Sequence, residues 1–488
     1  MKLINIFSVI IVCLLFSSCE IDKYNLDPNR PIEVEPESIL PNVLFQSFKN
    51  RYPWQPALAM RQITAVSDAQ DWQTYNFSYG SWDEYNILRD VQKMKETAER
   101  NESQEAYIAV SHILRAHNFY FLTCFYGDIP YSQALKGQDN TVADRFTPVY
   151  DSQKDVMIGI LDELEQANQI LKNEQLILKG DIIYNGDITK WRKAANSYKL
   201  RILIMLSNKK DDSDIQVTQK FSAIISNPSE YPVFTDRSDE LKLNYLDGDG
   251  TRYPLYEHLD TRNKRYMGKT ICDLMKNLQD PRLFYYAMPS NNAKQQGKAD
   301  TDFSAYDGID ATQKSEDINS DAESGDFSRI NQINYTTFQV GKPSLALSHS
   351  EIMLAIAEAI TRGWISGNAG TYYNAAMRAS MEFYDIGESD ITDYINGVAK
   401  YNPTKALQQI YEQRYILFYH QNDFEPLFHY HRTGYPQISC GMGQVTATVP
   451  YKMLYPQSEQ TVNKNNWDNA IKAQGYTSDR ILNKLWIY

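Results

Sequence analysis

Apolar residues recur at intervals of three and four along much of the chain, which is the spacing of an amphipathic α-helix. The clearest run lies within residues 151–171, and its apolar positions are Met157, Ile160, Leu161, Leu164, Ala167 and Leu171. Residues 187–206 repeat the pattern, with Trp191, Ala194, Ala195, Tyr198, Ile202 and Met205. Each run is long enough for a helix of about five turns, so the pattern predicts a mostly α fold.

A third run is apolar on nearly every face. Residues 350–360, "SEIMLAIAEAI", contain several Ala, and a helix of this kind is buried between neighbours that approach closely. Residues 367–386 are predicted to be helical again after a short turn. Two helices joined in this way form a unit of about 35 residues, as in tetratricopeptide arrays. Similar helical pairs are predicted near 85–125, 150–207 and 349–384.

Long irregular stretches separate these pairs. The largest, residues 289–343, is rich in Asn, Asp, Gly, Ser and Gln and shows little periodicity. Loops longer than about 15 residues are uncommon and tend to be functional or disordered. A helical frame that carries long polar and aromatic loops therefore indicates a binding protein.

The chain begins with a short apolar run that ends near a cysteine. Lys2 is followed by the 14 residues 3–16, which are too few for a membrane-spanning helix of about 20. The charged start, the apolar core and two small serines predict a signal peptide over residues 1–18. Cys19 then resembles the lipidated cysteine of bacterial lipoproteins, so we expect acyl chains there that anchor the protein. The alternative is an ordinary signal peptide with a chance cysteine, and in either case the polar, Pro-containing residues 19–38 are expected to form a tether.

Charge and composition exclude several classes of protein. The 488-residue chain has a formal net charge of −12, whereas binding to nucleic acid requires a basic face. The sequence contains no P-loop, GxSxG, HExxH or GxGxxG motif, so no cofactor is expected. Cys124, Cys272 and Cys440 are far apart in the sequence, which predicts buried thiols rather than a zinc or redox site.

Two groups of residues could bind a metal ion, but neither has the required spacing. Residues 420–436, "HQNDFEPLFHYHRTGYP", contain possible ligands, and Pro426 is expected to break the helix that would align them. Those candidates are His420, Asp423, Glu425, His429 and His431. Asp247 and Asp249 are spaced as at the start of a calcium loop, but the later acidic ligand is missing. We therefore predict hydrogen-bonded turns and no metal site.

Residues 70–81 form an aromatic loop in a polar setting. The chain contains 35 Tyr, 19 Phe and 7 Trp, and the rings of Tyr and Trp combine an apolar face with a polar edge. In this loop we predict stacking on sugar C–H faces and hydrogen bonding to sugar hydroxyls. The candidate ligand-binding residues are Trp72, Tyr75, Tyr79, Asp71 and Asn76. The alternative is a packing loop, and Trp82 is expected in the core at the start of the next helix.

Ordered blocks along most of the chain carry a family resemblance. They include "FYFLTCFYGDIPYSQAL" at 119–135, "YDSQKDVMIGILDELEQA" at 150–167, "DPRLFYYAMP" at 280–289, "AYDGI" at 305–309, "HYHRTGYPQ" at 429–437 and "NKLWIY" at 483–488. In these blocks the chain resembles the SusD/RagB family of outer-membrane lipoproteins of Bacteroidetes, in its SusD-like nutrient-binding branch. His431 and Ile487 depart from the family pattern, which usually has Arg and Trp there, and both lie in blocks that we interpret as structural.

The resemblance implies a mostly α, SusD-like fold with four tetratricopeptide-like helix pairs and long irregular loops. It implies a single nutrient-binding domain over residues 39–488, on a protein anchored by lipid to the outer membrane at the cell surface. Such a protein binds an oligosaccharide or another nutrient without chemistry and delivers it to a TonB-dependent SusC-like transporter. An α-helical glycoside hydrolase and a helical-repeat assembly scaffold are the alternatives. The missing catalytic motifs disfavour the hydrolase, and the aromatic loops disfavour the scaffold.

Overall fold

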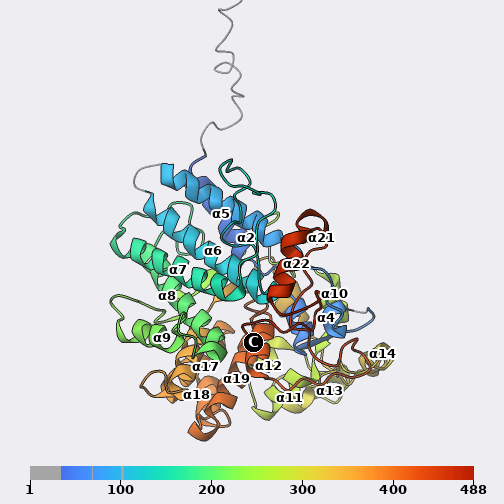
Figure 1. Cartoon of the computed structure of the whole chain (residues 1–488). Coiled ribbons are helices and arrows are strands. Elements are labelled where there is room, and N and C mark those ends of the chain that lie inside the picture. Colours follow the sequence, from blue (N-terminus) through green and yellow to red (C-terminus); the bar gives the residue numbers. More distant parts are fainter. Residues whose placement is uncertain (1–33, 69, 101–103) are drawn as a thin grey trace, which may run out of the picture.

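Long helices packed in pairs form most of the structure (Figure 1). The computed structural model describes residues 34–68, 70–100 and 104–488. The main pairs are α5 (Asp83–Arg100) with α6 (Glu105–Tyr126), α7 (Gln153–Asn173) with α8 (Ile188–Met205), and α16 (His349–Thr361) with α17 (Ala369–Phe383). A fourth pair follows, formed by α19 (Ala406–Leu417) and α20 (Glu425–Thr433). The mostly α fold that the sequence predicts is confirmed.

The predicted helical periodicity corresponds to burial. In α7 and α8, every apolar position that the spacing identified is buried. Side chains also set where these helices begin, because Ser152 accepts a hydrogen bond from the Asp155 amide and Asp187 accepts one from the Thr189 amide. Such caps satisfy amide donors that have no partner in the first turn. The sequence therefore determines both the buried face and the first residue of each helix.

The first described helix begins inside the predicted tether. α2 (Pro36–Phe48) has a proline in its first turn, where the missing amide donor is tolerated. The last residues of the expected tether, 36–38, are therefore helical. The predicted signal peptide (residues 1–18) and Cys19 lie outside the described residues. In the described part of the chain, no helix is both long and apolar enough to cross a membrane.

Short elements fill the regions between the long helices. The stretch 289–343, expected to be irregular, contains three short α-helices, α13 (Asn291–Gln295), α14 (Ser315–Ser324) and α15 (Gln332–Thr336). Ser290 and Asn331 cap the first and last of these, so local hydrogen bonds form turns of helix that apolar periodicity does not reveal.

The remaining α-helices of the described residues are α3 (Gln55–Ala59), α4 (Asp71–Thr74), α9 (Val217–Ser226), α10 (Leu259–Lys264), α11 (Lys269–Asn277), α12 (Arg282–Tyr286), α18 (Glu388–Asn396), α21 (Glu459–Val462) and α22 (Lys464–Ala473). Strands in the described residues are short: β1 (Ile63–Ala65), β2 (Leu241–Leu243), β3 (Arg265–Met267) and β4 (Ser344–Leu347). β1 pairs antiparallel with β3, and β2 pairs antiparallel with β4. The sheets are too small to form a core, which the helices provide.

One cluster of buried apolar side chains extends from Leu40 to Tyr488. The thiols of Cys124 and Cys272 are buried as predicted, whereas Cys440 is half-buried. The two departures from the family pattern both have packing roles. Ile487 is fully buried, and the His431 ring packs 4.8 Å from the ring of Tyr451.

A buried ionic cluster joins helices of the C-terminal half. Glu358 on α16 accepts hydrogen bonds from Arg432 on α20 at 2.6 Å and from Arg414 on α19 at 2.7 Å. All three side chains are almost fully buried. Burial alone would raise the pKa of Glu358, but the two guanidinium groups outweigh it and hold that pKa well below its usual range. Each charge thus depends on the others, and the cluster fixes how α16, α19 and α20 pack.

Candidate functional site

A hollow lined by polar side chains lies where three distant segments of the chain meet, and we call it the polar cleft. Its main part has a volume of about 240 Å³, and a smaller adjoining part has about 100 Å³. The main part is lined by Arg61, Thr64, Gly268, Lys269, Thr270, Asp273, Ile309, Asp310, Ala311, Thr312, Gln437 and Ser439. The adjoining part is lined by Ala65, Ser67, Asp68, Gln73, Thr74, Ala311, Gln313, Ser315, Ile318, Asn319 and Gly443. Ala311 lines both parts, so they lie next to each other.

Backbone pairing builds the floor of the polar cleft. β1 and β3 are adjacent, and the segment around Ile309 joins them because its amide donates to the Met267 carbonyl at 2.9 Å. The Thr64 hydroxyl donates to the Ile309 carbonyl at 2.9 Å. Two glycines permit this close approach: a Cβ on Gly268 would lie 2.2 Å from the Arg61 carbonyl oxygen, and one on Gly308 would lie 2.6 Å from the Gly268 carbonyl oxygen. Larger residues would force these backbones apart.

A loop from the C-terminal part of the chain forms one wall. The Gly443 amide donates to the Thr312 carbonyl at 3.0 Å, and the Gln444 side chain donates to the Ala311 carbonyl at 2.7 Å. The Val445 amide donates to the Thr74 carbonyl at 2.8 Å. This loop therefore connects the segment around residue 311 with the predicted ligand-binding loop 70–81.

Charged groups of both signs line the polar cleft. Lys269 and Asp273, one turn apart on α11, form an ion pair at 2.8 Å, and the hydrogen bond that Lys269 donates to the Asp273 carboxylate raises the pKa of Lys269. One carboxylate oxygen of Asp310 accepts the Thr312 amide at 2.9 Å. Donors and acceptors thus alternate over a short distance, an arrangement that suits a neutral ligand rich in hydroxyl groups.

Arg61 holds the 70–81 loop against the floor of the polar cleft. Its guanidinium donates to the Gln73 carbonyl at 2.8 Å and lies 4.3 Å from the centre of the Tyr75 ring. Two of its nitrogens, Nε and Nη2, are buried without a hydrogen-bond partner among the described residues. A buried donor without a partner costs free energy. We therefore infer that Arg61 lies here because its side chain shapes the site and gives it positive charge.

The five predicted ligand-binding residues have different environments. Asp71, Asn76 and Tyr79 are exposed, and the Asn76 side chain donates to Asp71 at 3.1 Å. Trp72 is half-buried, with its ring 4.3 Å from that of Phe77 and 4.8 Å from that of Phe424. These contacts show that the Trp72 ring also has a packing role.

Tyr75 corrects the sequence interpretation. Its side chain is fully buried and its hydroxyl donates to the Ala59 carbonyl at 2.9 Å, so the ring offers no surface to a ligand. The left-handed backbone of Tyr75, with φ of 60°, ends α4 and turns the ring inward. Trp82 lies just before α5 and packs on the rings of Tyr85 and Tyr126, each at 5.1 Å, in agreement with the expectation that it belongs to the core.

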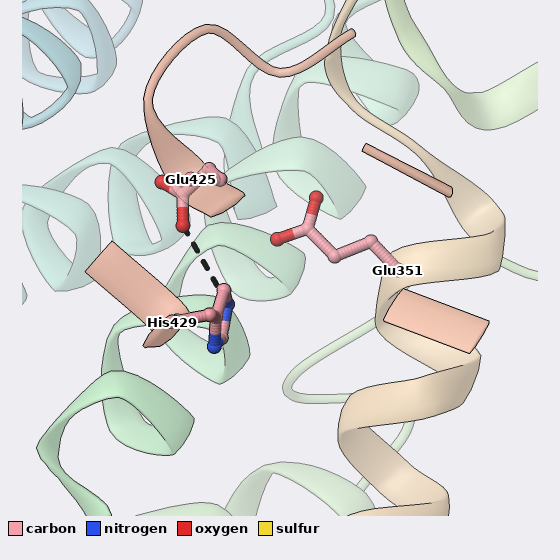
Figure 2. Close-up of side chains that lie close together, drawn as sticks. All are labelled: Glu351, Glu425 and His429. Carbon is pink, nitrogen blue, oxygen red and sulfur yellow. Dashed lines mark ion pairs between the residues drawn. The ribbon is translucent and has the colours of Figure 1, made fainter. Parts of the chain in front are cut away.

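The prediction that Pro426 breaks a helix is wrong. Pro426 lies in the first turn of α20, where proline is tolerated, and the helix continues through His429. Glu425 and His429 therefore share one face and converge with Glu351 from α16, as Figure 2 shows. The nearest atoms of Glu425 and His429 are 3.6 Å apart.

Arginines already provide the positive charge at this convergence. Arg201 pairs with Glu351 through two hydrogen bonds and lies 3.8 Å from Glu425. Arg432 donates to the Nδ1 atom of His429 at 3.2 Å, and the other ring nitrogen, Nε2, faces Glu425. Burial, together with the nearby arginines, lowers the pKa of His429. Two guanidinium groups next to these three residues oppose cation binding.

The other candidate metal ligands point to separate partners. His420 donates through Nδ1 to the Pro53 carbonyl at 2.7 Å, and its Nε2 lies 2.6 Å from the Tyr253 hydroxyl. His431 donates through Nε2 to the Pro450 carbonyl at 2.9 Å. In the loop around residue 248, the Arg252 guanidinium donates to Asp247 at 2.8 Å. The turn that the sequence predicted is present, and the Arg252 side chain holds it.

Sequence reasoning missed most of the polar cleft. Lys269, Asp273 and Asp310 come from segments whose meeting depends on the pairing of β1 with β3, strands of three residues each. A partial signal was present, because the stretch 289–343 was expected to carry function and "AYDGI" at 305–309 belongs to a family block. Neither observation indicates which side chains face the polar cleft.

Comparisons with known proteins agree with this architecture. A family described as starch-binding and associating with the outer membrane matches residues 28–456. An outer membrane protein from Bacteroides vulgatus, described as involved in nutrient binding, has 34% sequence identity and a TM-score of 0.86, with coverage of 93% of this chain and 100% of the other. A SusD homologue from Bacteroides fragilis has 33% identity and a TM-score of 0.84, with coverage of 93% and 99%.

A more distant structure shares the fold. A chitin-binding SusD homologue from Flavobacterium johnsoniae has 18% identity and a TM-score of 0.72, with coverage of 93% of this chain and 98% of the other. No curated protein sequence matches the chain.

Proposed function

Because the chain belongs to the SusD-like family of starch-binding proteins associated with the outer membrane, we propose that it captures oligosaccharide at the cell surface for a TonB-dependent SusC-like transporter. Members of this family are binding proteins, so the chain binds nutrient and is not an enzyme. The polar cleft is the structural feature that supports a saccharide as the ligand. It joins amide, hydroxyl and carboxylate groups on a rigid backbone floor, and these are the groups that hydrogen-bond to sugar hydroxyls.

The exposed residues of the 70–81 loop extend this site. Asp71 and Asn76 offer a carboxylate and an amide on the same loop that supplies Gln73 and Thr74 to the polar cleft, and Tyr79, with 46% of its surface exposed, offers a ring face for stacking. Trp72, on the same loop, packs its ring against that of Phe424. Of the five residues first predicted, we keep Asp71, Asn76 and Tyr79 as proposed contacts and Trp72 as a partly exposed neighbour.

We also propose that Cys19 carries the lipid anchor. Replacing Cys19 with Ala should move the protein from the membrane fraction to the soluble fraction, because a chain without acyl groups loses about 0.8 kcal/mol of membrane attachment for each buried CH₂. Fractionation and palmitate labelling of the variant and the wild type measure this directly. Membrane association and labelling equal to wild type would show that the anchor lies elsewhere.

The proposed transporter partnership predicts a stable complex. Bound saccharide must still enter the cell, and the stacked helix pairs provide a broad, rigid surface for a partner. Extraction of a tagged protein in mild detergent, followed by affinity purification, should recover a TonB-dependent outer-membrane receptor in roughly equal amount. Recovery of the protein alone in several detergents, from cells that demonstrably express such a receptor, would contradict this part of the proposal.

A further inference from the structure

A second polar hollow lies between α2 and α5, and we propose that it binds a saccharide independently of the polar cleft. Its volume is about 390 Å³, which falls within the range of small-molecule sites. The lining residues form two facing rows, Asn42, Gln46 and Lys49 on or just after α2, and Asp83, Asn86 and Asp90 on α5. We call it the α2–α5 groove. In Figure 1, α2 and α5 lie toward one end of the molecule, whereas α11, which lines the polar cleft, lies toward the other end.

The spacing along each helix places these side chains on the sides of α2 and α5 that face each other. Residues 42, 46 and 49 are four and three apart, and residues 83, 86 and 90 are three and four apart, so each row follows one face of its helix. α2 and α5 pack together through buried apolar residues, and Val43 and Ile87 form the bottom of the α2–α5 groove. The groove therefore has an apolar floor and two polar walls.

The amide groups in these walls are not engaged by the protein. The side chains of Asn42, Gln46 and Asn86 form no hydrogen bond with any other described residue. Lys49 has no carboxylate within ion-pair distance in the described part of the chain, and its ammonium lies 5.6 Å from the centre of the Phe45 ring. Deeper in the groove, Arg51 pairs with Glu84 at 2.9 Å, yet its Nε is buried without a partner among the described residues.

This set of groups fits a neutral, hydroxyl-rich ligand. Each amide offers two donors and an acceptor, which can bridge neighbouring hydroxyls of a sugar ring. Asp83 and Asp90 can accept from hydroxyls, and Lys49 can donate to them. Val43 and Ile87 can contact the C–H face of the ring. The lining carries two cations, Lys49 and Arg51, and two carboxylates, Asp83 and Asp90, so opposite charges balance and the groove favours a neutral ligand over a strongly charged one.

A second site would serve the proposed capture of saccharide polymers, and this inference rests on that proposed function for its ligand class. Two sites on one body hold a long chain more tightly than either site alone, because the second contact is intramolecular. The two sites can be separated experimentally because they share no residue.

Isothermal titration calorimetry tests the proposal on the full chain purified in detergent, with maltohexaose and chitohexaose as probes. The wild type should show two sites for at least one probe. In the double variant Gln46→Ala/Asn86→Ala, one site should remain unchanged while the other weakens at least tenfold, because two uncharged hydrogen-bonding groups are lost. Lys93→Ala, an exposed change on α5 outside the groove, serves as the matched control and should keep both sites. Blocking the polar cleft with Thr270→Trp should leave the α2–α5 site intact.

The possible failures differ in meaning. If Thr270→Trp abolishes all binding, or if the double variant keeps two unaltered sites, the second site is refuted and the proposed function stands. If the wild type binds neither probe, nor starch nor chitin polymer on affinity gels, the second site and the choice of saccharide as ligand are both refuted.

Discussion

Replacing Glu358 with Gln should lower the free energy of unfolding by about 3–5 kcal/mol, the usual cost of removing one partner from a buried ion pair. The carboxylate is the shared acceptor for Arg432 and Arg414, and neither guanidinium has solvent access to replace it. Gln keeps the shape of the side chain but not its charge. Urea denaturation followed by circular dichroism at pH 7 would measure the change.

The pH dependence of this effect has a defined sign. The pKa of Glu358 in the folded state lies below its usual range, whereas an unfolded glutamate titrates near about 4.3. The stabilisation from ionised Glu358 is therefore fully present above that value and is lost as the pH falls through the folded pKa. The difference between wild type and Glu358→Gln should shrink below about pH 4.3.

A surface pair provides the matched control. Glu388 pairs with Arg378, and the two side chains are 68% and 40% exposed, so Glu388→Gln should cost less than about 1 kcal/mol. Equal losses in the two variants would show that the buried cluster has no special role in joining α16, α19 and α20.

The second large effect concerns ligand binding. Thr270 lines the main part of the polar cleft near the start of α11, and an indole in its place should fill space that a sugar ring would occupy. Thr270→Trp should weaken saccharide binding at the polar cleft at least tenfold, equivalent to about 1.4 kcal/mol or more. Calorimetry with maltohexaose and chitohexaose measures the change in affinity, and thermal unfolding checks that the fold is kept.

Two further variants make this result specific. Thr337→Trp introduces the same ring at an exposed position outside the polar cleft and should leave affinity unchanged. Tyr79→Ala should weaken binding more than about threefold if the exposed ring stacks on the ligand. Unchanged affinity in Thr270→Trp, with the fold intact, would contradict the assignment of the polar cleft as a binding site.

The helical frame was predictable because it depends on local patterns. Spacing of three and four identified the buried faces of α7 and α8, and the Ala-rich run of α16 indicated burial on all sides. One prediction from a local pattern was wrong: Pro426 was expected to break a helix, but it lies in the first turn of α20. A proline signals a boundary, and the sequence alone did not show on which side the helix lay.

The site was less predictable because it depends on contacts between distant segments. The aromatic content of the 70–81 loop was visible, but whether each ring faces solvent or core depends on a left-handed turn at Tyr75 and on packing against Phe424. The polar cleft itself depends on the close approach of Arg61, Gly268 and Gly308. The periodicity of apolar residues along the sequence does not reveal a close contact between such distant segments.

The central claim is that saccharide binds in the polar cleft, and a crystal structure of the protein with a bound oligosaccharide tests it most directly. The ligand would be whichever of maltohexaose and chitohexaose binds more tightly in calorimetry. We predict density for at least one sugar ring in the polar cleft, with hydroxyls within about 3.2 Å of the side chain of Lys269, Asp273 or Asp310. A well-ordered saccharide bound only elsewhere, with the polar cleft open to solvent and free of crystal contacts, would contradict the account.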